Sequence, residues 1–245
     1  MEYLRTKEGQ IQADFARRAG QLLIQYEKLS RGLPSEENFE ATLTVALLQS
    51  MLTICYESLE HSDKKDDAIG LIGLAKSSIS EMPTRLGLEA NCIMERWPSS
   101  RELSYREIFA ALRNALSHPG LQGDSRYPIT GYTTLVSGSN FIKAFEFVHS
   151  PWVNENGSGL RFPQKKKEEI KGYLISKAKK WESKTGDKSL YVNRDELGQW
   201  MIFRDGKKFV PVLRIHLTVQ QLRTLTLTLS DMLSSQLEQA PAIHA

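Results

Sequence analysis

An arginine, an asparagine and a histidine lie close together at the end of one expected helix: Arg113, Asn114 and His118. Arginine is always charged, and histidine titrates near neutral pH. The pair suits phosphoryl chemistry, because an imidazole can move a proton while a guanidinium stabilises charge on phosphate oxygens. The sequence therefore offers these three residues as a candidate catalytic site, and the rest of the chain is expected to position them.

The helix that carries these residues has signals at both ends. Ser104 and Glu107 form a capping-box pattern, and good helix formers follow from 105 to 116. Apolar residues recur along one side of this run, which is typical of an amphipathic helix packed against a core. Pro119 and the glycine after it end the helix.

Pro119 also affects His118, because the residue before a proline is pushed out of the α region. His118 is therefore expected to leave the helical path and swing toward Arg113. Asn114 lies four residues before His118 and would share its face of the helix, so that the amide could orient the imidazole. Alternatively, His118 is a structural residue that hydrogen-bonds the last carbonyl groups of the helix.

This pattern, Arg113-Asn114 followed by His118-Pro119 at the end of a capped amphipathic helix, resembles the HEPN family (higher eukaryotes and prokaryotes nucleotide-binding domains). The nucleases of that family carry an arginine, a polar residue directly after it and a histidine four to six residues further on. Over the rest of the chain the resemblance extends only to the order of the helices. It implies a helical bundle and assigns catalysis to Arg113, Asn114 and His118.

The resemblance further implies a metal-independent endoribonuclease that uses the 2′-OH of RNA as nucleophile and needs no cofactor. HEPN nucleases pair two motifs across a two-fold cleft, so a homodimer with facing Arg113–His118 sets is expected. The usual setting of the family implies a bacterial toxin or antiviral defence effector, with an antitoxin or defence-system protein as a partner. The alternative is an inactive HEPN-like module that binds RNA, nucleotide or protein, in which replacing His118 would leave function intact.

Composition is that of an ordinary globular protein. Of the 245 residues, 40% are hydrophobic and 25% are charged, which is enough for a sizeable core. A net charge of +3 and a pI near 8.7 permit an anionic partner. Cys55 and Cys92 lie in apolar surroundings, as reduced buried thiols do. No leader and no apolar run long enough to cross a bilayer is evident, so we expect a cytoplasmic protein without a membrane partner.

Hydrophobic periodicity divides the chain into helices, a mixed segment and a closing helix. Besides the motif helix, helices are predicted over 10–30, 35–59, 68–82, 86–97, 165–183 and 218–237. Strands are predicted over 127–136 and 141–148, and a β-hairpin over 200–217 with its turn at Asp205-Gly206. We therefore predict one mainly α, HEPN-like domain over 1–245. Its helical bundle comprises 10–120 and 218–238, with a small α/β insertion at about 125–217.

The lysine-rich segment 165–188 is a second feature of interest, with nine lysines and four acidic residues. It could form a track for RNA phosphates, with Trp181 as a stacking surface. Alternatively, it is a solvated helix face with Trp181 in the core. His61, in a charged turn, and His216, on a strand face, are assigned no role, and no residues stand at metal-binding spacing.

Overall fold

The computed structural model describes residues 8–33, 39–56, 86, 88, 90–95, 103–118, 127–138, 141–153, 160–161 and 169–239. The helices are α1 (Glu8–Ser30), α2 (Glu40–Ser50), α5 (Tyr105–Ser117), α6 (Ile170–Thr185) and α7 (Val219–Gln239). The strands are β1 (Ile93–Glu95), β2 (Gly131–Val136), β3 (Ile142–His149), β4 (Leu190–Arg194), β5 (Trp200–Arg204), β6 (Lys207–Lys208) and β7 (Leu213–Thr218). A π-helical turn, Met51–Tyr56, extends α2.

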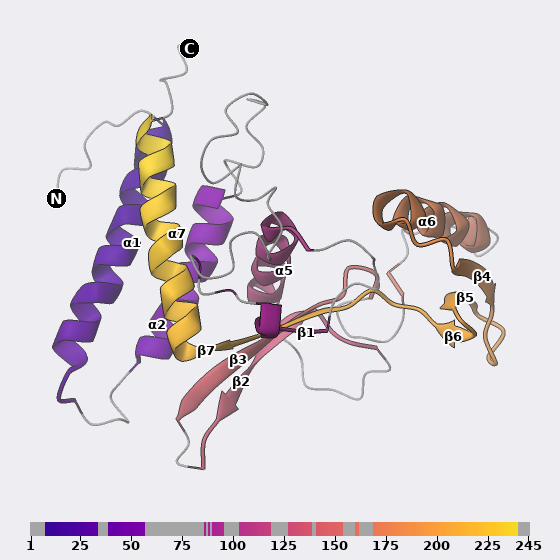
Figure 1. Cartoon of the computed structure of the whole chain (residues 1–245), viewed down its shortest axis with the longest axis horizontal. Coiled ribbons are helices and arrows are strands. Elements are labelled where there is room, and N and C mark those ends of the chain that lie inside the picture. Colours follow the sequence, from indigo (N-terminus) through magenta and orange to yellow (C-terminus); the bar gives the residue numbers. More distant parts are fainter. Residues whose placement is uncertain are drawn as a thin grey trace.

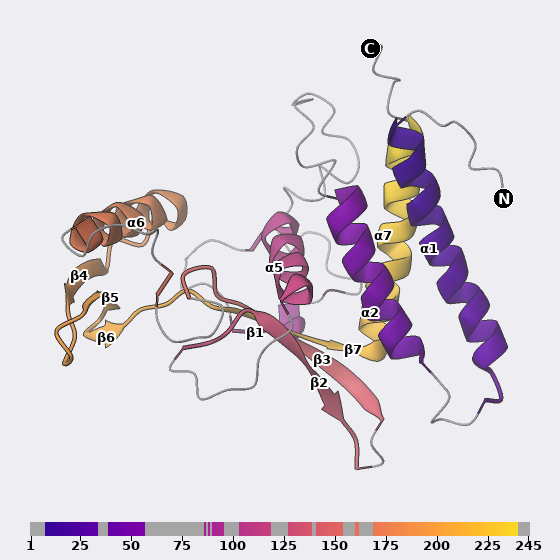
Figure 2. The same ribbon diagram turned by 180° about the vertical axis from the view of Figure 1, so that it is seen from behind.

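These elements form three parts along the long axis of the molecule (Figure 1). Helices α1, α2 and α7 stand together at one end. Helix α5 lies over an antiparallel sheet of order β1-β7-β3-β2 in the middle. Helix α6 and a second antiparallel sheet, of order β4-β5-β6, form the other end, as the reverse view also shows (Figure 2).

The first end is held together by close packing of α1 and α7. Helix α7 buries leucines at spacings of three and four residues, namely Leu222, Leu225, Leu229 and Leu233. A Cβ on Gly20 would lie 2.3 Å from Ser230 Oγ, so the two helices can approach this closely because residue 20 is glycine. The Ser230 hydroxyl donates to the carbonyl oxygen of Ala16 at 2.6 Å and is thereby satisfied in the core.

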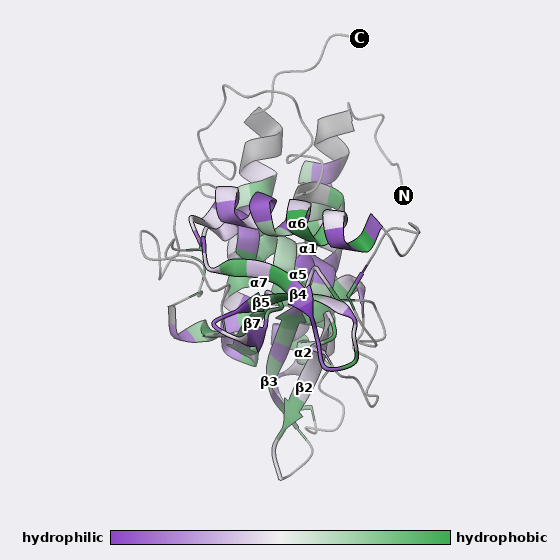
Figure 3. Ribbon diagram, turned by 90° about the vertical axis from the view of Figure 1, so that its right-hand side faces the viewer, coloured by the Kyte–Doolittle hydropathy of each residue, from purple (hydrophilic) through white to green (hydrophobic). Residues whose placement is uncertain are grey.

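The other end is anchored by an aromatic cluster of Trp152, Trp181 and Phe209, whose ring centroids are 5.5 to 5.9 Å apart. Trp181 comes from α6 and is buried, which agrees with the interpretation that placed it in the core. Hydrophilic and hydrophobic residues alternate along α6 (Figure 3). Trp181 fixes one side of α6 against the aromatic cluster, and Lys177 of the same helix lies over the Trp152 ring.

The predicted mainly α fold with a small insertion is wrong. The described residues form five α-helices and seven strands in two antiparallel sheets, so the fold is mixed α/β. Part of the predicted helix 86–97 is a 3-10 turn, Ala90–Cys92, followed by strand β1, which pairs with β7. Periodicity cannot separate a short buried strand from a short helix, and this strand is stabilised by a partner more than a hundred residues away in sequence.

The predicted hairpin over 200–217 is correct at its turn and wrong beyond it. Asp205 and Gly206 have φ values of 49° and 75°, as a tight hairpin turn requires. The returning strand β6 is only two residues long, and the chain then leaves this sheet so that β7 pairs with β3. Pro211 lies between the two strands and has no N–H to donate to a ladder.

The predictions for α1, α5, α6 and α7 are confirmed to within a few residues at the ends that the structure describes. Cys92 is a buried free thiol. The predicted helix over 68–82, both ends of the predicted helix over 35–59, the turn at His61 and the side chain of Cys55 lie outside the described residues. No helix among those described is long and apolar enough to cross a membrane.

Candidate active site

Helix α5 presents the candidate residues at its C-terminal end. At its start, Ser104 Oγ accepts from the Glu107 N–H at 3.4 Å, and the Glu107 carboxylate accepts from the Ser104 N–H at 3.0 Å. This is the capping box that the sequence predicted. At its end, His118 has φ −124° and ψ 88°, so it has left the helical path, as expected before a proline. Asn114 is half-buried and His118 is exposed.

The amide of Asn114 is paired with a histidine that the sequence analysis did not single out. Asn114 Nδ2 lies 3.3 Å from Nε2 of His149, the last residue of β3. The predicted partner of the amide was His118. Side chains alternate along a strand, so His149 shares the face of Phe145 and Phe147, which are buried in the core beneath α5. Strand β3 thus places His149 beside the C-terminal end of α5.

A cavity of about 110 Å³ lies where α5 and β3 meet. Its lining residues are Asn114, His118, Thr130, His149, Ser150, Pro151, Val153 and Arg161. Two of the three predicted site residues, Asn114 and His118, therefore line one cavity, together with His149 and Arg161. Arg113 is not among the described residues that line it, although its charge acts on His149.

His149 has the most perturbed electrostatic environment of the site. Its pKa is lowered from 6.5 to about 4, first by burial and then by the nearby charges of Arg113, His118 and Arg161. The imidazole of His149 is therefore neutral at pH 7. The positive charge of the site comes from the two guanidinium groups, which attract an anion without being neutralised by deprotonation.

The wall opposite α5 is fixed by hydrogen bonds. The Ser150 N–H donates to Thr130 Oγ1 at 2.9 Å, and the Ser150 hydroxyl donates to the carbonyl oxygen of Pro211 at 3.3 Å. Further along, the Arg161 N–H donates to the carbonyl oxygen of Trp152 at 2.7 Å. This last bond returns the chain to the site and places Arg161 at the cavity.

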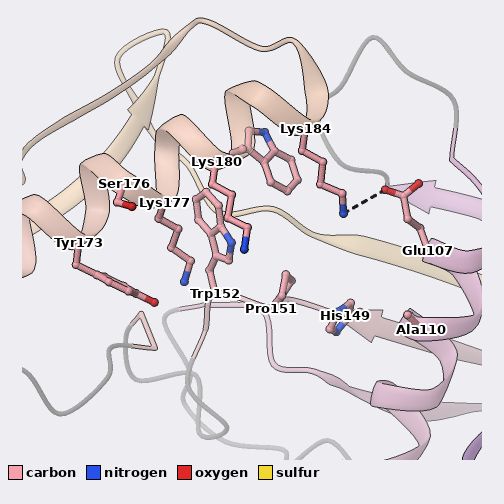
Figure 4. A pocket seen from close by; sticks show the side chains of 11 residues that line it. Glu107, Ala110, His149, Pro151, Trp152, Tyr173, Ser176, Lys177, Lys180 and Lys184 are labelled. Atoms are coloured by element: carbon pink, nitrogen blue, oxygen red, sulfur yellow. Dashed lines mark ion pairs between the residues drawn. The ribbon is translucent and has the colours of Figure 1, made fainter. Parts of the chain in front are cut away.

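A second, larger cavity of about 520 Å³ adjoins the first, because His149 and Pro151 line both. Its other walls come from α6 and from the start of α5 (Figure 4). Lys177, Lys180 and Lys184 of α6 line it, and Lys184 Nζ lies 3.6 Å from the Glu107 carboxylate. Residues of the lysine-rich segment and of the predicted catalytic motif thus line two neighbouring cavities that share His149.

Sequence reasoning missed His149 and Arg161. A signal for His149 exists, because side chains alternate along a strand, so that His149 shares the face of two phenylalanines at the end of the predicted strand. Arg161 has no comparable local signal. Its position depends on the pairing of Val153 with Leu160, which is a tertiary feature.

No group of three or more metal-ligating side chains occurs in the described part of the chain. Comparisons of the sequence with protein-family models and with curated proteins, and of the structure with solved structures, find no match. The function must therefore be inferred from the site itself.

Proposed function

We propose that the protein is a metal-independent endoribonuclease of the HEPN type, which cleaves RNA through attack of the 2′-OH on the adjacent phosphate. The observation that carries the proposal is the 110 Å³ cavity at the end of α5. There an exposed histidine, a half-buried amide–histidine pair and Arg161 line one small space, and the charge of Arg113 acts on the same histidine. RNA supplies its own nucleophile, so the protein needs only to move protons and to stabilise charge.

In the proposed reaction, a bond forms between the 2′-oxygen and phosphorus, and the bond from phosphorus to the 5′-oxygen breaks. A general base takes the proton of the 2′-OH, and a general acid supplies a proton to the departing 5′-oxygen. His118 is the exposed imidazole of the cavity and takes one of these roles. Arg113 and Arg161 stabilise the charge of the transition state. The products are a 2′,3′-cyclic phosphate and a 5′-OH.

Asn114 and His149 have supporting roles in this proposal. Their hydrogen bond at 3.3 Å holds both side chains at the cavity wall. The neutral imidazole of His149 adds no charge that would compete with the arginines for the phosphate. Asn114 is placed to donate its second amide hydrogen to a phosphate oxygen.

The second proton-transfer group comes from a second copy of the chain. A single imidazole cannot take the 2′-OH proton and supply the proton of the 5′-oxygen in the same step. His118 is the one exposed histidine in the described lining of the cavity, so we propose a homodimer in which two Arg113–His118 sets face each other. Mixing wild type with an excess of His118→Ala should then lower the activity below that of the same amount of wild type alone, because a mixed dimer carries only one of the two imidazoles that the reaction needs. A strictly monomeric protein with full activity would overturn the dimer.

The proposed setting is the bacterial cytoplasm, where such a ribonuclease would act as a toxin or antiviral effector. Its partner would be an antitoxin or another protein of the same defence system. The motif resemblance supports this part of the proposal, and the buried free thiol of Cys92 agrees with a reducing compartment.

The decisive experiment incubates total RNA and transfer RNA in EDTA with wild type, His118→Ala and the matched control His216→Ala. His216 lies on β7, outside both cavities. We expect wild type and His216→Ala to cleave and to leave 2′,3′-cyclic phosphate ends, and His118→Ala to be slower by about 10²–10⁴-fold. If none of the three proteins cleaves RNA but wild type binds it, the protein is an inactive RNA-binding module and not a nuclease. Equal cleavage by all three proteins would show that the site is wrong.

A further inference from the structure

The larger cavity beside His149 is positively charged on one side. Lys177, Lys180 and Lys184 stand three and four residues apart on α6, so they share one face of the helix and line the cavity together. In Figure 4 the amines of Lys177 and Lys180 extend from α6 toward Trp152, and Lys184 extends toward Glu107. Glu107 is the one carboxylate among the described lining residues.

That carboxylate does not balance the charge of the cavity. Glu107 lies 3.6 Å from Lys184 and also closes the capping box of α5. The charges of Lys177 and Lys180 therefore have no acidic counterpart in the described wall. An external anion that enters the cavity would gain from both charges.

Lys177 is held in place rather than extended into solvent. Its Nζ lies 5.0 Å from the ring centroid of Trp152 and 5.4 Å from that of Tyr173. Burial lowers the pKa of Lys177 to about 8, and the positive charge of Arg161 contributes in the same direction. Arg161 lines the smaller cavity, so positive charge continues from one cavity to the other.

The shape and the charge favour an extended ligand with several negative charges. His149 and Pro151 line both cavities, so an extended molecule bound at the smaller one has only these two residues to pass to reach the larger one. Trp152 and Trp181 are buried and packed edge to face, which leaves no open tryptophan face on which a base could stack. The cavity thus provides lysine amines that can bind backbone phosphates of a nucleic acid, and it provides few groups that could distinguish one base from another.

We propose that the α6 face formed by Lys177 and Lys180 binds the phosphates of a single-stranded RNA next to the phosphate that is cleaved. This inference rests on the proposed ribonuclease function and adds to it how the strand runs. The strand passes from the smaller cavity, over His149 and Pro151, onto α6. Contacts at α6 go to the backbone, so this face contributes affinity with little sequence preference.

The binding test uses a fluorescently labelled 2′-O-methyl hexanucleotide, which cannot be cleaved because its 2′-OH is blocked. Anisotropy titrations compare wild type with Lys177→Gln, Lys180→Gln and the matched control Lys179→Gln. Lys179 is an exposed lysine of α6 that lines neither cavity. We expect losses of about threefold to tenfold in affinity for Lys177→Gln and Lys180→Gln and none for Lys179→Gln. The slope of log affinity against log salt should fall by about 0.7 for each lost contact.

Three results would overturn the inference. Equal losses for Lys179→Gln and Lys180→Gln would show unspecific attraction to a basic helix. Wild-type affinity in Lys180→Gln, whose side chain is exposed and whose loss should leave the fold intact, would show that the cavity does not hold the strand. Displacement of the hexanucleotide by an equal concentration of adenosine monophosphate would point to a mononucleotide site in place of a strand.

A cleavage test separates this inference from the ribonuclease proposal. A dinucleoside monophosphate has only the scissile phosphate and cannot reach α6, whereas a hexanucleotide can. We expect Lys180→Gln to raise KM for the hexanucleotide and to leave kcat/KM for the dinucleotide unchanged. Equal losses on both substrates would place Lys180 at the scissile phosphate and overturn the inference. If wild type cleaves neither RNA but Lys180→Gln still weakens binding of the hexanucleotide, the strand-binding site on α6 is supported and the ribonuclease proposal is wrong.

Discussion

The two cavities that meet at His149 and Pro151 differ in size and in the groups that they offer. The smaller one, of about 110 Å³, contains two histidines, an amide and an arginine. The larger one, of about 520 Å³, contains three lysines beside aromatic rings. The first set can move protons and stabilise developing charge, whereas the second supplies fixed positive charge for a ligand already bound.

The cavities also differ in how the chain builds them. The smaller one is assembled from three separate parts of the chain, namely the end of α5, the end of β3 and Arg161. The lysines of the larger one come from a single helix, α6. Reactive groups need mutual geometry from several rigid elements, whereas charge can be supplied by one helix face. Changes in the smaller cavity should therefore alter catalysis, and changes in the larger one should alter affinity.

After the loss of His118, the largest expected effect is that of Arg113→Lys. Lysine keeps the charge but loses the planar fork of donors that matches two phosphate oxygens. We expect kcat for RNA cleavage to fall by about 10²–10³-fold, while the affinity for a 2′-O-methyl hexanucleotide stays close to that of wild type. Single-turnover cleavage and anisotropy measure the two quantities. A loss of affinity as large as the loss of rate would contradict the assignment of catalysis to the smaller cavity and of strand affinity to the larger one.

His149→Gln should remove a pH-dependent part of the stability. The pKa of His149 is 6.5 in the unfolded chain and about 4 in the folded one, so between these values the unfolded chain alone is protonated. The free energy of unfolding therefore falls as pH decreases from about 6.5 to about 4, by about 3 kcal/mol from this group. Urea unfolding from pH 7 to pH 4 should show a steeper decline for wild type than for His149→Gln. Parallel profiles would contradict the burial of this imidazole.

The sequence predicts those parts of this site that depend on neighbouring residues. The capping box of α5 and the departure of His118 from the helix are decided within a few positions, and both are present in the structure. The partner of Asn114 is 35 residues away, so the amide could be predicted to hold an imidazole but not which one. Local chemistry fixes the ends of a helix, whereas tertiary packing decides what lies opposite.

The fold follows the same division. Helix α7 was predictable from its leucine spacing and from the Thr218–Gln221 cap, in which the Gln221 N–H donates to Thr218 Oγ1 at 3.2 Å. Strand β1 was predicted as a helix because three residues are too few to show the alternation of a strand, and its pairing with β7 cannot be read from the local sequence. The sequence predicted that α5 is part of a helical bundle. In the structure α5 lies on the sheet that contains β1 and β7.

Ser104→Ala tests whether the start of α5, which borders the larger cavity, is independent of its end. The loss of the cap should lower the free energy of unfolding by about 1 kcal/mol, as should Thr218→Ala at the start of α7. Neither change should alter kcat, because the last turn of α5 holds the cleavage site. Thermal melts and cleavage rates measure both. A drop in kcat for Ser104→Ala alone would show that the two ends of α5 are coupled.

The smallest expected effect is the pH dependence of strand binding at Lys177. Arg161 faces this amine from the smaller cavity, the rings of Trp152 and Tyr173 lie beside it, and its pKa is lowered to about 8. Raising the pH from 7 to 9 should remove its charge and weaken binding of the 2′-O-methyl hexanucleotide a few-fold. An arginine stays charged over this range, so Lys177→Arg should bind with nearly constant affinity. If both proteins lose affinity equally, the titrating group lies elsewhere and Lys177 does not contact the strand.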